Sequence, residues 1–287
     1  MKKNRVIDII IAAAVMASSF FICGCENKTV AAVAGDSGVK LPVVMYHSIV
    51  DSDERASKYV VKPSVVEQDF TWLRDNGYTS VSAAQLLDYV YGTGDLPDKP
   101  VLITLDDGFF NNLSYLPPLL EKYDFHAVVS VVGAFTAKES DACPKQSNIY
   151  SYLRWDQINE LCGMGRVEIG NHTYNMHGSG GRQGVVRASG ESDGEYYGSV
   201  QRDIEKLQQK LREKCGIVPA IFTYPYGTET DIAREVVSDM GFRVTLTCRE
   251  YVNMIERGKD CLLELGRYNR QSGVSSEEFF GAMTKLR

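Results

Sequence analysis

The sequence predicts an α/β fold in which a parallel sheet closes, or nearly closes, into a barrel. Short apolar runs alternate with helical patterns, and several runs are apolar throughout, as expected of strands that are covered on both faces. The chain has 287 residues, 44% hydrophobic and 24% charged, which is enough for one large domain with a full core. In such a barrel, chemistry is expected on the loops that follow the strands.

Seven apolar runs are the predicted strands: Val43–Tyr46, Val101–Leu105, Ala127–Val132, Val167–Ile169, Ala220–Tyr224, Val244–Thr247 and Leu262–Leu265. Capping boxes predict helix starts, and they pair Ser64 with Glu67, Ser82 with Gln85, and Ser275 with Glu278.

A longer helix is expected over residues 199–214, where apolar residues recur at helical spacing before Gly216. The preceding stretch, residues 178–198, is rich in Gly, Ser and charge and has no hydrophobic period. It is interpreted as a long loop on the substrate side of the domain.

The N-terminus has the pattern of an export signal. Basic residues precede an apolar run, Ile9–Ile22, that is shorter than the roughly 20 residues needed to span a bilayer. The run ends in Ile-Cys-Gly-Cys, which resembles the lipobox of bacterial lipoproteins. We therefore expect a signal peptide over residues 1–24, lipid on Cys25, a tether over residues 25–38 and a folded domain over residues 39–287. The domain would sit at the outer face of the membrane; an uncleaved anchor or secretion is the alternative.

Charge and cysteine content exclude several classes of protein. The net charge of −6 offers no basic surface for nucleic acid. No glycine-rich dinucleotide or P-loop motif follows a strand, which disfavours a nucleotide cofactor. Beyond the lipobox, five cysteines remain without a CxxC pair, so a disulfide framework is not expected. No protein partner can be inferred.

Two adjacent carboxylates end the second predicted strand, in Asp106-Asp107-Gly108. Successive strand side chains point to opposite faces, so both acids reach one site only if the chain turns there, which Gly108 permits. Two neighbouring carboxylates raise each other's pKa unless a cation lies between them. An aspartate helix cap is the alternative interpretation of this motif.

Two histidines, His172 and His177, follow the short strand at Val167–Ile169. Their spacing of five does not stack on a helix face but suits a loop around an ion. With one aspartate they would form a two-histidine, one-carboxylate site with open positions, the pattern of a catalytic metal. Two solvated loop histidines are the alternative.

A turn follows a third strand, in Tyr224-Pro225-Tyr226-Gly227. Such a turn can aim a backbone N–H outward, as a developing oxyanion requires. Taken in this order, the three segments resemble the polysaccharide deacetylases of the NodB-homology type, carbohydrate esterase family 4, over about Leu41–Leu286. The Met45-Tyr46-His47 segment resembles the poly-N-acetylglucosamine deacetylase branch.

The resemblance implies a distorted (β/α) barrel of seven or eight strands and a divalent metal, usually zinc, or cobalt or nickel. It also implies Asp107, His172 and His177 as metal ligands, Asp106 as general base and the backbone N–H of Tyr226 as oxyanion donor. The expected substrate is an N-acetylated polysaccharide of the cell surface, with exopolysaccharide favoured over peptidoglycan.

Two departures from the family pattern are visible. Many members take their general acid from a histidine near the C-terminus, but none follows His177 here, and the candidates are His47 and His126. In the poly-N-acetylglucosamine branch a histidine on the first strand is assigned as the acid, so the resemblance implies His47. His126, at the start of an apolar strand, is interpreted as structural. Many members also tether the base with an arginine where this chain has Thr223, and Arg267 or Arg270 is the predicted substitute. These departures leave two other functions open, an O-acetyl esterase on xylan or a wall polymer and a non-catalytic glycan-binding lipoprotein.

Overall fold

The computed structural model of the protein describes residues 38–178 and 182–285. The expected signal peptide, Cys25 and nearly all of the expected tether lie outside the described residues. None of the helices within the described ranges is both long and apolar enough to cross a membrane.

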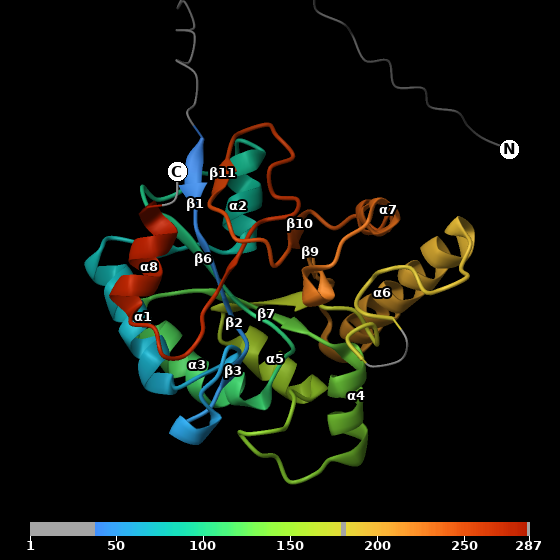
Figure 1. The fold of residues 1–287 in the computed structure, drawn as a ribbon, viewed down its shortest axis with the longest axis horizontal. Helices are drawn as coiled ribbons and strands as arrows, with labels where there is room; N and C mark the ends of the chain where they lie inside the picture. The colour runs from blue at the N-terminus through green and yellow to red at the C-terminus, as the bar shows by residue number, and fades with distance from the viewer. Residues whose placement is uncertain (1–37, 179–181, 286–287) are drawn as a thin grey trace, which may run out of the picture. The chain divides into compact units, whose positions relative to one another are not determined.

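A parallel sheet forms the centre of the fold (Figure 1). Its main path runs in the order β10-β9-β8-β7-β6-β2-β12, and β5 pairs with the start of β6. The strands of this sheet are β2 (Val43–Tyr46), β5 (Thr79–Ser80), β6 (Pro100–Leu105), β7 (Ala127–Val131), β8 (Val167–Asn171), β9 (Ile221–Thr223), β10 (Val244–Leu246) and β12 (Tyr268–Asn269).

Residues 262–270 link the two edges of this curled sheet. Leu265 exchanges backbone hydrogen bonds with Thr245 and Thr247 beside β10, with N···O distances of 2.8 and 3.0 Å. A few residues later Tyr268 pairs with Val44 of β2. The predicted distorted (β/α) barrel is therefore confirmed, with seven parallel strands on its main path.

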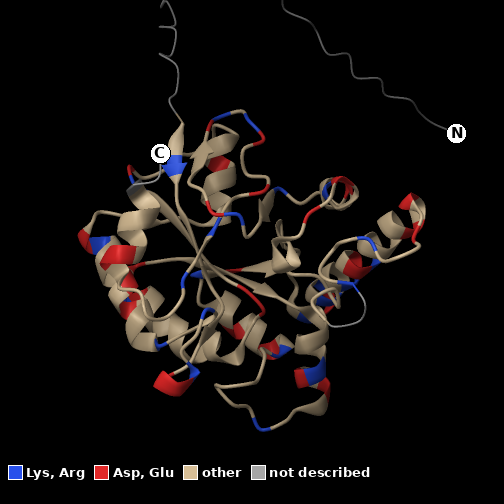
Figure 2. Ribbon diagram, viewed as in Figure 1, with Lys and Arg blue, Asp and Glu red and all other residues tan. Residues whose placement is uncertain are grey.

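Helices cover the outside of the sheet (Figure 1). They are α1 (Pro63–Asp75), α2 (Ala83–Val90), α3 (Phe110–Tyr123), α4 (Gly133–Ala142), α5 (Trp155–Gly163), α6 (Asp193–Cys215), α7 (Asp231–Asp239) and α8 (Ser276–Lys285), with short 3-10 turns η1 (Asp53–Arg55) and η2 (Pro225–Gly227). Lys, Arg, Asp and Glu lie mainly on these helices and their loops, while the central strands are almost free of them (Figure 2). The amphipathic pattern of the sequence is thus the pattern of a covered sheet.

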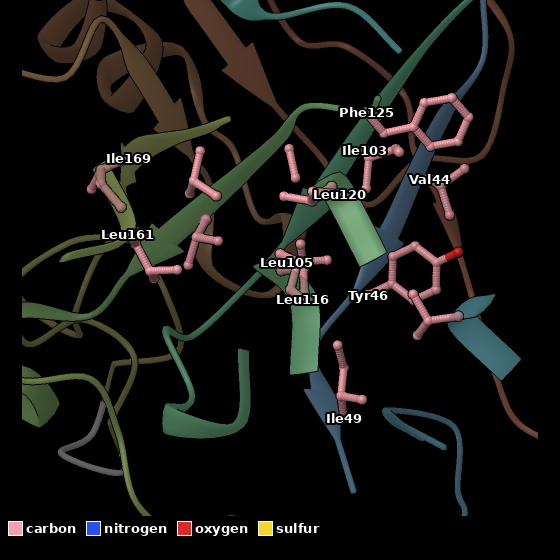
Figure 3. Close-up of a cluster of buried hydrophobic side chains, with 14 of the residues drawn as sticks. Val44, Tyr46, Ile49, Ile103, Leu105, Leu116, Leu120, Phe125, Leu161 and Ile169 are labelled. Atoms are coloured by element: carbon pink, nitrogen blue, oxygen red, sulfur yellow. The ribbon is translucent and has the colours of Figure 1, made fainter. Parts of the chain in front are cut away.

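The main core lies between the sheet and the helices α1, α3, α5 and α8. In it, Leu116 and Leu120 of α3 pack near Ile103 and Leu105 of β6 (Figure 3). All four side chains are essentially inaccessible to solvent. Burial of this kind contributes about 25 cal/mol per Å² of apolar surface removed from water. It fixes the position of β6, whose end carries the two aspartates.

The structure corrects several local predictions. The run Leu262–Leu265 forms only an isolated bridge at Leu265, and the regular strand is β12. Helix α1 begins at Pro63 with Lys62 as N-cap and no side-chain cap, so the box at Ser64 is wrong. The box at Ser82 is confirmed. Helix α6 begins at Asp193, because Ser192 and Glu195 form a capping box within the stretch interpreted as loop.

Two short pairings outside the main sheet were not predicted. Strand β1 (Val39–Leu41) pairs antiparallel with β11 (Asn253–Ile255), and β3 (Ser48–Ile49) pairs with β4 (Val60–Val61). Strands of two or three residues are too short to show an alternating pattern in the sequence. The β3–β4 pair fixes the segment that precedes β4, because the N–H of Ser48 donates to the carbonyl of Tyr59 at 3.1 Å.

Candidate active site

The strand ends that carry the predicted site residues meet at one edge of the sheet. Strands β2, β6, β8 and β9 all run parallel, so the residues after them lie side by side. His47, the two aspartates, both histidines and Tyr226 line a common cleft of about 650 Å³. All six residues predicted from the sequence are thus brought together.

A left-handed turn separates the two aspartates. Asp106 still pairs with the strand ladder, because its N–H donates to the carbonyl of Tyr46 at 3.0 Å. Asp107 then adopts φ 71° and Gly108 φ 68°, and a Cβ on Gly108 would lie 2.9 Å from Cγ1 of Val131. This turn lets both carboxylates enter one cleft. Aspartate is among the non-glycine residues that tolerate this left-handed conformation.

The loop after β8 holds the two histidines. His172 makes a hydrogen bond from Nδ1 to the carbonyl oxygen of Thr223 on β9, with a distance of 2.8 Å. This contact assigns the proton to Nδ1 and leaves Nε2 free as a metal ligand. The ring of His177 stacks on Tyr226, with centroids 4.6 Å apart and an interplanar angle of 24°.

Asp107, His172 and His177 form a cluster that fits a divalent metal. Oδ1 of Asp107 lies 3.2 Å from Nε2 of His177 and 3.6 Å from Nε2 of His172, and the three ligand atoms lie within 4.8 Å of one another. Oδ1 of Asp107 is buried, and no described residue gives it a hydrogen bond. Three protein ligands beside a cleft leave positions open for water and substrate, as in catalytic zinc sites.

The electrostatics of the cluster also favour a cation. Burial, and then the charge of Asp106, raise the pKa of Asp107 to about 7. Burial lowers the pKa of His172 to about 3, so its imidazole is neutral at pH 7 and able to bind a metal. A cation between the three ligands would favour the ionised form of Asp107.

Asp106 is held by a buried arginine inside the barrel. Both oxygens of Asp106 accept from Arg267, from Nη1 and Nη2 at 2.7 Å each. Nε of Arg267 donates to the carbonyl of Thr247, also at 2.7 Å, and neither Asp106 nor Arg267 is appreciably exposed. Burial alone would raise the pKa of Asp106, but the charge and hydrogen bonds of Arg267 outweigh it and hold that pKa well below its usual value.

Comparison with known proteins assigns this arrangement to a family. The polysaccharide deacetylase family matches residues 93–245, which include both aspartates and both histidines. This chain belongs to the polysaccharide deacetylase family. The poly-β-1,6-N-acetyl-D-glucosamine N-deacetylase of Escherichia coli K12 is 28% identical over 222 residues, or 71% of this chain. The chain spans about a third of the length of that relative.

Solved structures agree with the assignment. A de-N-acetylase from Aggregatibacter actinomycetemcomitans is 25% identical, with a TM-score of 0.72 over 86% of this chain and 99% of the other. IcaB from Ammonifex degensii is also 25% identical, with a TM-score of 0.68 over 86% of this chain and 97% of the other. The similarity therefore extends well beyond the segment that the family model covers.

The structure shows which arginine contacts Asp106 in place of the one that many family members carry at the position of Thr223. Thr223 is buried and its hydroxyl contacts Ser130 Oγ at 2.7 Å. Arg267 contacts Asp106 instead, whereas Arg270 pairs with Asp69 of α1. Of the two predicted substitutes, Arg267 is confirmed as the neighbour of the carboxylate and Arg270 is wrong.

His47 lines the cleft, as predicted for the acid, and His126 does not. Nδ1 of His47 is buried and has no hydrogen-bond partner among the described residues. His126 precedes β7 and so lies at the opposite end of the strands from the cleft.

Sequence reasoning missed several other residues that line the cleft, among them Tyr59, Glu250 and Asn269. They come from the segment before β4, the loop after β10 and strand β12. None belongs to a motif, and only the pairing of distant segments places them here.

Proposed function

We propose that this protein is a metal-dependent N-deacetylase that acts on N-acetylglucosamine units of a cell-surface or extracellular polysaccharide. One observation carries the proposal: a three-ligand cluster with open positions lies beside Asp106, a buried carboxylate kept ionised by Arg267. The names of the relatives from E. coli and A. actinomycetemcomitans, both N-deacetylases, support the choice of an amide substrate.

Each group of the site has a separate role in the proposed hydrolysis. A bound zinc ion, or cobalt or nickel, would supply a Lewis acid that polarises the acetyl carbonyl and acidifies water. Asp106 accepts the proton of the attacking water, because its ionised form is the stable one beside Arg267. The backbone N–H of Tyr226 donates to the acetyl oxygen as it becomes negative. The carbon–nitrogen bond then breaks, giving acetate and a glucosamine amine.

His47 is the proposed acid that protonates the leaving nitrogen. Burial lowers its pKa to about 4, and the negative charge of Asp106 opposes this shift. His47 is therefore neutral at pH 7 before the reaction and must gain a proton before it can donate one. The proton that water loses to Asp106 supplies this need, so no net proton is taken from solvent for the amine to leave.

Acetate release tests the function. The purified protein would be assayed on N-acetylglucosamine oligomers after chelation and after addition of zinc, beside Asp106→Asn, His47→Ala and His126→Ala. We expect zinc-dependent release that falls about 10²- to 10⁴-fold in Asp106→Asn and His47→Ala, the usual contribution of a general base or acid. His126→Ala is the matched control and should retain activity.

Other outcomes identify the competing functions. Release from acetylated xylan but not from N-acetylglucosamine oligomers would replace the amidase with an O-acetyl esterase. Zinc binding without release from either polymer or from peptidoglycan would contradict an enzyme and favour a glycan-binding protein.

We also propose that the protein is exported and held at the outer face of the membrane by lipid on Cys25. The Ile22-Cys23-Gly24-Cys25 pattern supports this placement. Metabolic labelling with a radioactive fatty acid should mark the wild-type protein but not Cys25→Ser. Unlabelled wild-type protein in the culture medium would instead indicate secretion.

A further inference from the structure

An aromatic ring lies in the cleft without a role in the proposed chemistry. Tyr59 precedes β4, lines the same cleft as Asp106 and is 48% exposed. Its ring centroid lies 4.8 Å from that of His47, at an interplanar angle of 58°. A half-exposed aromatic ring beside the proposed acid offers a flat apolar face to a ligand in the cleft.

The backbone around Tyr59 is fixed from two directions. Its carbonyl accepts from the N–H of Ser48 on β3, with an N···O distance of 3.1 Å. The preceding carbonyl, of Lys58, accepts from Nδ2 of Asn269 on β12 at 2.8 Å. Because both strands anchor this segment, the backbone that carries the ring loses little conformational freedom when a ligand covers the ring.

An exposed carboxylate lies on the same wall of the cleft. Glu250, in the loop after β10, lines the cleft, and its Oε1 accepts from the backbone N–H of Asn269 on β12 at 3.5 Å. Asn269 also anchors the Lys58 carbonyl, so the carboxylate and the ring of Tyr59 lie on the same side of the cleft. An aromatic face beside hydrogen-bond acceptors suits a sugar, which has an apolar face of C–H groups and a rim of hydroxyl donors.

We infer that Tyr59 and Glu250 form a second sugar subsite, which binds the unit next to the one that loses its acetyl group. The inference rests on the proposed function and names the part of the polymer that the cleft recognises. The adjacent unit stacks on Tyr59, and one of its hydroxyls donates to the exposed carboxylate of Glu250. Since Tyr59 contacts His47, the proposed acid, this neighbour lies on the side of the cleft where the amine leaves. Tyr59 is then a positioning residue for the polymer.

Steady-state kinetics on the N-acetylglucosamine pentamer would test the subsite in the zinc-loaded full-length protein. Tyr59→Leu keeps bulk against His47 but removes the flat face, whereas Tyr59→Phe keeps the face. We expect Tyr59→Leu to raise KM roughly three- to tenfold, the effect of one lost aromatic contact, with kcat within about twofold. Tyr59→Phe should stay near wild type. Tyr91→Leu is the matched control, because Tyr91 is 63% exposed at the end of α2 and does not line the cleft.

A lower kcat with unchanged KM in Tyr59→Leu would overturn the subsite, since it would mean that the ring only holds His47. Unchanged kinetics would overturn it as well. A binding measurement distinguishes failure of the subsite from failure of the proposed function. Calorimetric titration of the pentamer into Asp106→Asn and into the double variant Asp106→Asn/Tyr59→Leu needs no turnover. The double variant should bind roughly three- to tenfold more weakly; equal affinity would contradict the subsite even if the wild-type protein released no acetate.

Discussion

Two buried arginine–aspartate pairs in this protein have the same chemistry and different surroundings. Arg267 holds Asp106 through two hydrogen bonds of 2.7 Å, and Arg270 holds Asp69 through bonds of 2.8 and 3.0 Å. All four side chains are almost fully buried. The arginines lie three residues apart on one segment, so the difference between the pairs comes from what surrounds the carboxylates.

The carboxylate of Asp69 accepts hydrogen bonds from more residues than the carboxylate of Asp106 does. Asp69 also accepts from the hydroxyl of Tyr46 at 2.9 Å and from that of Ser276 at 2.6 Å. Among the described residues, the carboxylate of Asp106 accepts only from Arg267, and it lines the cleft beside Asp107. A carboxylate can accept about four hydrogen bonds, so Asp106 keeps capacity for a water molecule. Spare capacity beside a cleft, more than burial or charge, distinguishes the proposed base from a structural ion pair.

The largest expected contrast is between Asp106→Asn and Asp69→Asn. Each leaves a buried arginine without its counter-charge, which should cost about 3–5 kcal/mol of stability. Only Asp106→Asn should lose activity, by about 10²- to 10⁴-fold, when both are assayed below their melting temperatures. Acetate release and calorimetric melting measure the two effects. Equal activity losses in both variants would remove the distinction.

Variants of the two arginines should differ in activity in the same way, with smaller effects. Lysine keeps the charge but cannot make the paired bonds of a guanidinium, so Arg267→Lys and Arg270→Lys should each lose about 1.5–3 kcal/mol of stability. Arg267→Lys should also lower kcat roughly tenfold to hundredfold, because it shifts Asp106 relative to the substrate. Wild-type kcat in Arg267→Lys would show that the geometry of Asp106 is not critical.

The stabilisation of the folded protein by zinc should depend on the cluster beside Asp106 and not on the Arg270–Asp69 pair, and it can be measured without turnover. A ligand that binds only the folded state at 100 times its Kd stabilises that state by about 2.7 kcal/mol. Wild-type protein and Asp69→Asn should both melt at higher temperature with zinc, whereas His177→Ala should lose most of the shift. A full shift in His177→Ala would mean that zinc binds elsewhere.

The smallest effect is expected at Ser276, whose hydroxyl donates to Asp69 of the structural pair and which does not line the described cleft. Ser276→Ala removes one hydrogen bond to the charged Asp69, so it should cost about 1.5 kcal/mol, at the low end for bonds to charged groups. Denaturant unfolding would measure the loss, and kcat should stay at the wild-type value. A fall in kcat would show that α8 communicates with the cleft.

The sequence by itself determined the fold class and the residues at the strand ends. Continuous apolar runs between helical patterns specify a covered parallel sheet, because periodicity is local information. Parallel strands place their ends at one edge, which is why the order of strands and motifs along the chain was enough to assign Asp106, Asp107, His172 and His177 to one site. The helix start at Ser82 followed equally from local capping chemistry.

Only the tertiary structure decided which partners those residues meet. Arg267 and Arg270 could not be told apart as partners of Asp106, since an odd spacing on an extended segment sends their side chains to opposite faces and the register of that segment depends on its pairing with β2 and β10. The same long-range pairing brings Tyr59 and Asn269 into the cleft from segments more than 200 residues apart. Such contacts depend on how elements dock, because no short stretch of sequence carries both partners.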